Sequence, residues 1–202
     1  MMASVYGVLI YAVVYASVSL VQYLDTAMFE IRPKEKIAVS VCSASMGILL
    51  ACIVRIRCMS RGEALLLAVF AGCLLFACLT DVKECYVYQF VWWLAGAAGG
   101  ILLLLHWQKV SLISLLVYLL LQEFFFAGCY GRADCHAFAV SAVILCALGG
   151  GMTAYWLHML LAFVCLGVVQ MFAHNVNRKG QLKRAVAFLP YITLGFWVLL
   201  FF

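Results

Sequence analysis

The chain has 202 residues, of which 68% are hydrophobic and only 10% are charged. A soluble domain of this size carries about a quarter charged residues, so the composition excludes an ordinary water-soluble globule. The net charge of +5 does not indicate nucleic-acid binding, because no segment combines a basic patch with a soluble fold. We therefore expect a polytopic membrane protein that lies in a lipid bilayer.

The long apolar runs are apolar all round and lack the alternation of β-barrel strands, so they predict an all-α membrane helix bundle with about eight transmembrane helices. The first run has no basic segment before it, which favours a retained helix over a cleaved signal. The sixth is shorter than the ~20 residues that usually cross a bilayer. Pro190 in the last run predicts a local kink. The expected spans are residues 4–24, 37–54, 64–79, 86–105, 110–127, 135–148, 152–172 and 186–202.

The loop charges predict an orientation. With eight spans, the first, third, fifth and seventh connections share one side of the membrane. That side has more Lys and Arg than the other, and the positive-inside rule places it in the cytoplasm. The richer set is Arg32, Lys34, Lys36, Lys83, Arg132, Arg178, Lys179, Lys183 and Arg184, and the poorer set is Arg55, Arg57, Arg61 and Lys109.

The chemistry-bearing motifs of common enzymes are missing from the sequence. The ten cysteines form no C-x-x-C pair, so a zinc ribbon is not expected. There is no H-E-x-x-H, G-x-S-x-G or P-loop string. We expect neither a metal site nor a cofactor.

A short polar break at residues 128–136 separates two apolar runs and contains Asp134. An ionisable residue at a membrane boundary costs several kcal/mol unless it is solvated or paired, so it is a functional candidate. Asp81 ends the third expected span, and its connection belongs to the same cytoplasmic set. The two carboxylates can therefore meet at one end of a helix bundle.

Two carboxylates that lie close together cannot both ionise cheaply, so one keeps a proton while the other stays charged. The charged member can take a proton from water, and the protonated member can polarise a peptide carbonyl. This is the chemistry of an aspartic peptidase. The competing interpretation is that Asp81 and Asp134 are only solvated helix-end residues.

Three strings in this order resemble the type IV prepilin peptidases. Residues 81–87 read Asp-Val-Lys-Glu-Cys-Tyr-Val and resemble the first active-site motif of that family. Residues 131–134 read Gly-Arg-Ala-Asp and resemble its second motif, Gly-x-Gly-Asp. Residues 187–195, which contain Pro190, resemble the proline-containing start of the family's last helix. The resemblance covers roughly residues 64–202.

The resemblance implies an integral-membrane aspartic endopeptidase that cuts the short basic leader from prepilin-like or pseudopilin substrates at the cytoplasmic face. It implies that Asp81 and Asp134 are catalytic, that no cofactor is used, and that the protein works in the plasma membrane beside pilus or secretion assembly machinery. It divides the chain into two N-terminal helices, 1–63, and a catalytic bundle, 64–202. The chain looks like a short form without the methylation-linked domain of larger members.

Several neighbours are expected to support the two aspartates. Ala133 stands where the family has its second Gly, and alanine restricts φ more than glycine does. His136 stands where the family often has Lys, and histidine is a pH-dependent cation. Glu123 and Pro190 are candidates for a substrate groove, although Glu123 can equally reach toward lipid headgroups. The remaining supporting residues are Lys83, Gly131 and Arg132.

Two alternatives stay open. A non-enzymatic bundle, either an inactive pilus or secretion assembly factor or a small transporter, also places carboxylates in a membrane. Transporters often have an internal repeat, and this sequence has no clear repeat between its halves. A presenilin-type protease also uses Gly-x-Gly-Asp, but its first Asp follows Tyr, whereas Thr80 precedes Asp81 here.

Overall fold

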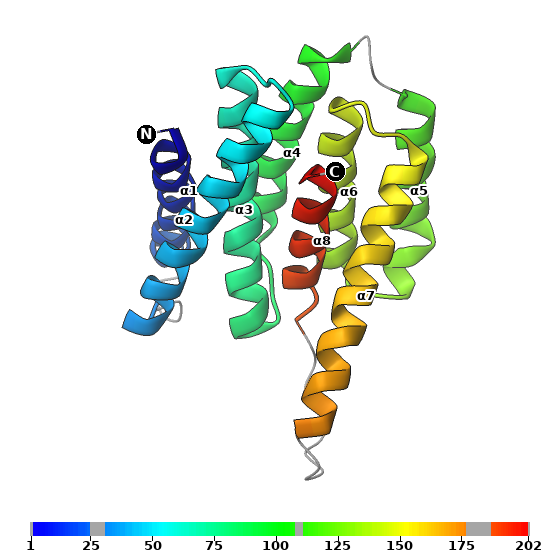
Figure 1. The fold of residues 1–202 in the computed structure, drawn as a ribbon. Coiled ribbons are helices and arrows are strands. Elements are labelled where there is room, and N and C mark those ends of the chain that lie inside the picture. The colour runs from blue at the N-terminus through cyan, green and yellow to red at the C-terminus, as the bar shows by residue number, and fades with distance from the viewer. Residues whose placement is uncertain (1, 25–30, 108–110, 177–186, 202) are drawn as a thin grey trace. The chain divides into compact units, whose positions relative to one another are not determined.

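The computed structural model describes residues 2–24, 31–107, 111–176 and 187–201, and the side chains of 172–176 are outside that description. The described residues are 88% helical and contain no strand, so the all-α prediction is confirmed. The basic run from Arg178 to Arg184 and Lys109 lie outside the described residues. The helices are α1 (Met2–Leu24), α2 (Pro33–Ile56), α3 (Arg61–Glu84), α4 (Gln89–Leu105), α5 (Leu112–Phe124), the 3₁₀ turn η2 (Phe126–Gly128), α6 (Arg132–Ala147), α7 (Met152–Val176) and α8 (Leu189–Phe201) (Figure 1).

Each apolar run forms one helix, with ends that differ from the predicted ends by a few residues. The prediction of a kink at Pro190 is wrong. Helix α8 begins at Leu189, so Pro190 lies in the first helical turn, where its missing N–H would have no partner inside the helix anyway. Proline there starts the helix without bending it.

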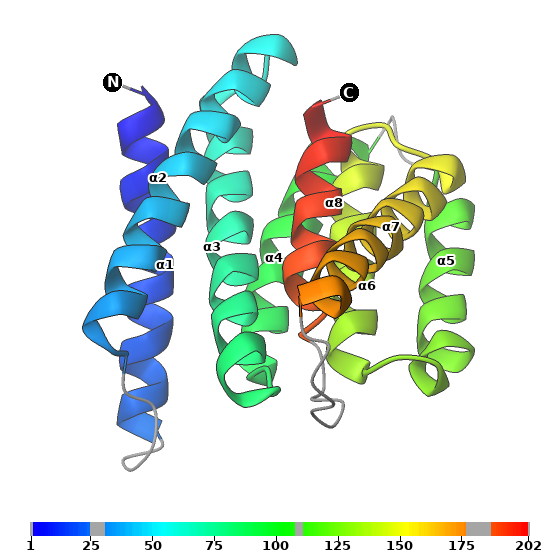
Figure 2. The ribbon, with the colours of Figure 1, turned by 60° about the horizontal axis from the view of Figure 1, so that its bottom comes forward.

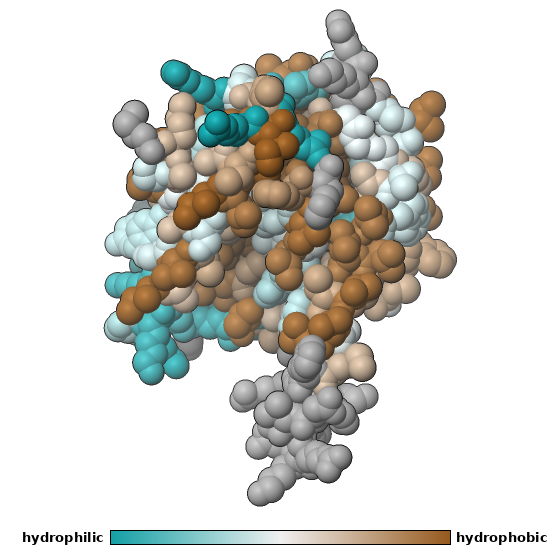
Figure 3. Space-filling view, viewed as in Figure 1, coloured by the Kyte–Doolittle hydropathy of each residue, from teal (hydrophilic) through white to brown (hydrophobic). Residues whose placement is uncertain are grey.

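Among the described residues, four helices are long and apolar enough to cross a membrane by length and composition: α1, α2, α3 and the Met152–Met171 part of α7. Helices α4, α5 and α8 are apolar but shorter. Large apolar side chains are exposed, among them Ile113 at 80% and Phe124 at 82%, and apolar residues form much of the surface seen in Figure 3. A protein with this surface belongs in a membrane.

The chain forms two compact units. Unit 1 comprises residues 1–77 and 88–102, and unit 2 comprises residues 78–87 and 103–202. Most of helix α3 therefore belongs to unit 1, and its last residues, from Cys78 on, belong to unit 2. Both Asp81 and Asp134 belong to unit 2.

Unit 1 is packed by close approach of backbones. Helices α1 and α2 form a hairpin in which Gly47 lies against Gly7: a Cβ at Gly47 would meet the Gly7 nitrogen at 2.5 Å and the Ala3 oxygen at 2.7 Å. A Cβ at Gly72 of α3 would likewise meet the side chain of Val13 at 2.7 Å. Small residues allow such contacts in membrane bundles, where van der Waals packing between helices replaces the hydrophobic effect.

Unit 2 is packed around aromatic side chains and cross-helix hydrogen bonds. The buried ring of His158 in α7 bonds through Nε2 to the backbone oxygen of Ile192 in α8 at 2.9 Å, so this side chain joins two helices. Cys78 and Thr193 form a second contact, 3.2 Å between sulfur and oxygen. Helices α6 and α8 begin at the same end of unit 2, the lower end in Figures 1 and 2.

Candidate active site

Asp81 lies in the last turn of α3 and is half-buried. Its Oδ2 accepts a hydrogen bond from the backbone N–H of Leu189 at 3.2 Å. Leu189 is the first residue of α8, whose early N–H groups have no partner inside the helix. The carboxylate of α3 therefore caps α8, a contact between residues 108 positions apart.

Asp134 is the third residue of α6 and is also half-buried. The backbone N–H of Gly131, the residue immediately before the helix, lies near this carboxylate and favours its ionised form. Asp134 stands at the position from which an acidic side chain reaches back to the N-cap in a capping box. A Cβ at Gly131 would lie 3.2 Å from Asp134 Oδ2, so glycine leaves room for the carboxylate.

The two carboxylates are close enough to affect each other's charge. The pKa of Asp134 is raised from 3.8 to about 6. Burial is the largest cause, the negative charge of Asp81 also raises the pKa, and the Gly131 N–H opposes the rise. Asp134 lies in the polar break, just before the sixth expected span, and so outside the membrane-spanning segments. Near neutral pH the pair therefore holds a proton more readily than two isolated aspartates would.

An aromatic cluster that sequence reasoning missed lies beside the pair. Tyr130 stacks on Phe126 with ring centroids 5.7 Å apart. It contacts the edges of Phe138 at 5.7 Å, Phe163 at 6.0 Å and Phe188 at 6.4 Å. Phe188 directly precedes Leu189, the residue whose N–H binds Asp81. The cluster thus joins the polar break to the start of α8.

A buried glutamine holds Tyr130 in place. The hydroxyl of Tyr130 donates to Oε1 of Gln122 at 2.7 Å, and Gln122 is 1% exposed. Its Nε2 donates to the sulfur of Met159 at 3.4 Å. A polar side chain this deep is expected to be hydrogen-bonded. A glutamine within an apolar run was therefore the signal in the sequence for a buried polar contact at this end of α5.

The other predicted site residues surround the pair with unequal burial. Lys83, Ala133, His136 and Pro190 are half-buried, whereas Glu123, Gly131 and Arg132 are exposed. The backbone N–H of Gly131 lies near the carboxylate of Asp134. The supporting roles of the others stay predictions.

The backbone at Ala133 is ordinary helix. Within the described residues, the non-glycine residues with positive φ are Cys58 and Cys85, and Ala133 lies inside the first turn of α6. Glycine is therefore not required for the local conformation, because an alanine adopts helical φ without strain.

The described residues contain no group of three or more His, Cys, Asp or Glu side chains suited to hold a metal. The chain matches no family model, and no curated protein or solved structure is significantly similar to it. The geometry of the Asp81–Asp134 pair is therefore the main guide to function.

Proposed function

We propose that the chain is an integral-membrane aspartic endopeptidase that removes the short basic leader from prepilin-like or pseudopilin proteins at the cytoplasmic face of the plasma membrane. One observation carries the proposal. Asp81 and Asp134, far apart in sequence, lie at one end of unit 2, and the charge of one raises the pKa of the other. Aspartic peptidases depend on such a pair.

The different environments of the two carboxylates favour different roles for them, one as the acid and one as the base. Asp134, with its raised pKa, keeps the proton and donates a hydrogen bond to the scissile carbonyl oxygen. Asp81, held by the Leu189 N–H, stays ionised and takes a proton from the attacking water. The water oxygen bonds to the carbonyl carbon, and the departing amine then receives a proton as the C–N bond breaks.

The substrate class follows from where the pair lies and from the resemblance in the sequence. Both aspartates lie at helix ends, beside apolar helices, which suits a substrate with an apolar helix and a cleavage point at the membrane boundary. The exposed carboxylate of Glu123 in α5 adds negative charge near the start of α6 and complements a basic leader. Pilus or secretion assembly machinery is the expected partner.

The test is cleavage of a co-expressed prepilin by the wild type and by Asp81→Asn and Asp134→Asn. Each variant should lose cleavage by at least about a thousandfold, because a pair of groups that act together fails when either is removed. Glu84→Gln, an exposed carboxylate three residues from Asp81, is the matched control and should cleave normally. Normal processing by either aspartate variant, with equal protein in the membrane, would refute the proposal.

A non-enzymatic bundle is the second candidate, and one observation favours it. The contacts of Asp81 with the Leu189 N–H and of Asp134 with the Gly131 N–H are typical of ordinary helix caps, and caps alone stabilise helices by ~1 kcal/mol each. If capping is their whole role, the wild type should not cleave any prepilin. The same cleavage assay therefore separates the two functions.

A further inference from the structure

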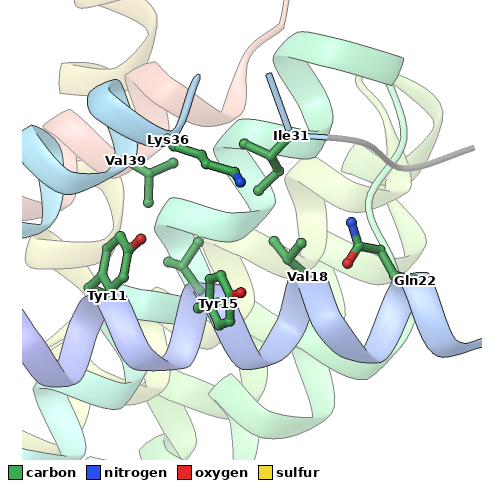
Figure 4. Close-up of a pocket in the computed structure, with 8 residues that line it drawn as sticks. Tyr11, Tyr15, Val18, Gln22, Ile31, Lys36 and Val39 are labelled. Atoms are coloured by element: carbon green, nitrogen blue, oxygen red, sulfur yellow. The ribbon is translucent and has the colours of Figure 1, made fainter. Parts of the chain in front are cut away.

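The helix hairpin of unit 1 has a groove that the proposed peptidase chemistry does not use. Two clefts lie between α1 and α2, of about 270 Å³ and about 460 Å³. They share Tyr11 as a lining residue, so they are adjacent along the hairpin, and together they are called the α1/α2 groove below. Figure 4 shows the first cleft from the side, with side chains of α1 and α2 directed toward each other.

The groove is polar at one end and apolar along the rest. Lys36 of α2 extends across the first cleft and Gln22 of α1 lies at the same end (Figure 4). The hydroxyl of Tyr15 adds a hydrogen-bonding group there. The second cleft is formed mainly by small and aliphatic residues, namely Ala3, Ser4, Gly7, Val8, Tyr11, Ser40, Ser43, Ala44 and Ile48.

One buried polar atom in the second cleft has an unmet hydrogen bond. Ser43 is 1% exposed, lines the cleft, and its hydroxyl has no hydrogen-bond partner among the described residues. A buried hydroxyl without a partner costs about 1–3 kcal/mol.

We propose that the α1/α2 groove binds an anionic phospholipid of the surrounding bilayer. The phosphate lies at Lys36, where its negative charge is complemented, and one acyl chain follows the groove past Tyr11 toward Ile48. A cation at one end of an apolar groove between two membrane helices fits a lipid with an anionic headgroup. The site is independent of the proposed peptidase activity, because both aspartates belong to unit 2.

The test uses purified full-length protein in nanodiscs that contain a trace of photo-crosslinkable phosphatidylglycerol, with phosphatidylcholine of the same chains as the neutral probe. Crosslinked residues are mapped by mass spectrometry. Labelling of groove residues by phosphatidylglycerol should fall about fivefold in Lys36→Gln, the effect of removing one cation near an anionic headgroup. Lys34→Gln, an exposed lysine outside the groove, should change nothing.

A second pair of variants tests the apolar part. Ser40→Leu fills the groove and should reduce labelling by both probes, whereas Ser45→Leu, on an exposed position of the same helix outside the groove, should not. Thermal unfolding of each variant shows that the fold is retained. Labelling spread evenly around α1 and α2, or equal phosphatidylglycerol labelling in Lys36→Gln, would overturn the proposal. A wild-type dimer that Ser40→Leu converts to monomer would mean that a second copy occupies the groove.

Discussion

The two units hold their helices together by different means. In unit 1 the backbones of α1 and α2 touch at Gly7 and Gly47, and such a contact leaves no room for side chains. In unit 2 polar side chains bond across helices, as Asp81 does to Leu189 and His158 does to Ile192. The difference bears on the candidate site, because Asp81 is positioned by a contact with the start of another helix, α8.

The largest expected effect is at the backbone contact of unit 1. Gly47→Ala should destabilise the protein by about 3 kcal/mol, the upper end of the cost of overpacking. The added Cβ would lie 2.5 Å from the Gly7 nitrogen, and backbone atoms cannot move aside as a flexible side chain can. Thermal unfolding in detergent measures the effect.

The matched control is Gly96→Ala in α4, also in unit 1, where a Cβ would meet nothing within 4 Å. This variant should be neutral or more stable by up to about 1 kcal/mol, because alanine is the better helix former. Equal destabilisation by the two variants would show that the Gly7–Gly47 contact does not hold the hairpin together.

The next effect is on stability at the carboxylate pair. Because the pKa of Asp134 is raised from 3.8 to about 6 in the folded protein, the folded state binds the proton more tightly, and stability falls as pH rises through that window. Asp134→Asn removes this penalty. It should stabilise the protein by about 1–2 kcal/mol at pH 8, after allowance for partial solvent screening, while abolishing cleavage.

The pH dependence makes this prediction specific. Well below pH 3.8 the carboxyl of Asp134 is protonated in both states, so the gain from Asp134→Asn shrinks as the pH falls from 8 to 4 and should disappear below about pH 3. Cleavage by the wild type should likewise decline above about pH 6, as Asp134 loses the proton that it donates to the carbonyl. A stability gain that is equal at pH 4 and pH 8 would contradict the raised pKa.

A smaller effect is expected at the hydrogen bond that holds the aromatic cluster. Tyr130→Phe keeps the ring contacts with Phe126 and Phe138 but leaves Oε1 of the buried Gln122 without the 2.7 Å bond from Tyr130. The cost should be about 1–2 kcal/mol. Tyr23→Phe, at a position 81% exposed, should cost nothing measurable in the same unfolding assay.

The sequence predicted the helices well because most apolar runs are long and end at charged or turn residues. It also indicated the Asp81–Asp134 pair, since both residues fall at span ends on one expected side. It could not predict that Leu189 donates to Asp81, because that bond depends on how α8 starts, and Pro190 was misinterpreted for the same reason. Tyr130 was missed because its role depends on rings from four separate segments.

The smallest expected effect is at Ala133, where the resembling family has glycine. Ala133→Gly should leave cleavage within about twofold of the wild type, because the alanine already has helical backbone in the first turn of α6 and the carboxylate of Asp134 is held by Gly131 instead. It should destabilise the protein by only about 0.5–1 kcal/mol, the usual cost of glycine in a helix. Cleavage kinetics and thermal unfolding of the same preparation measure both. A large rise in cleavage would mean that the alanine restrains the pair after all, and that the helical start of α6 must open for catalysis.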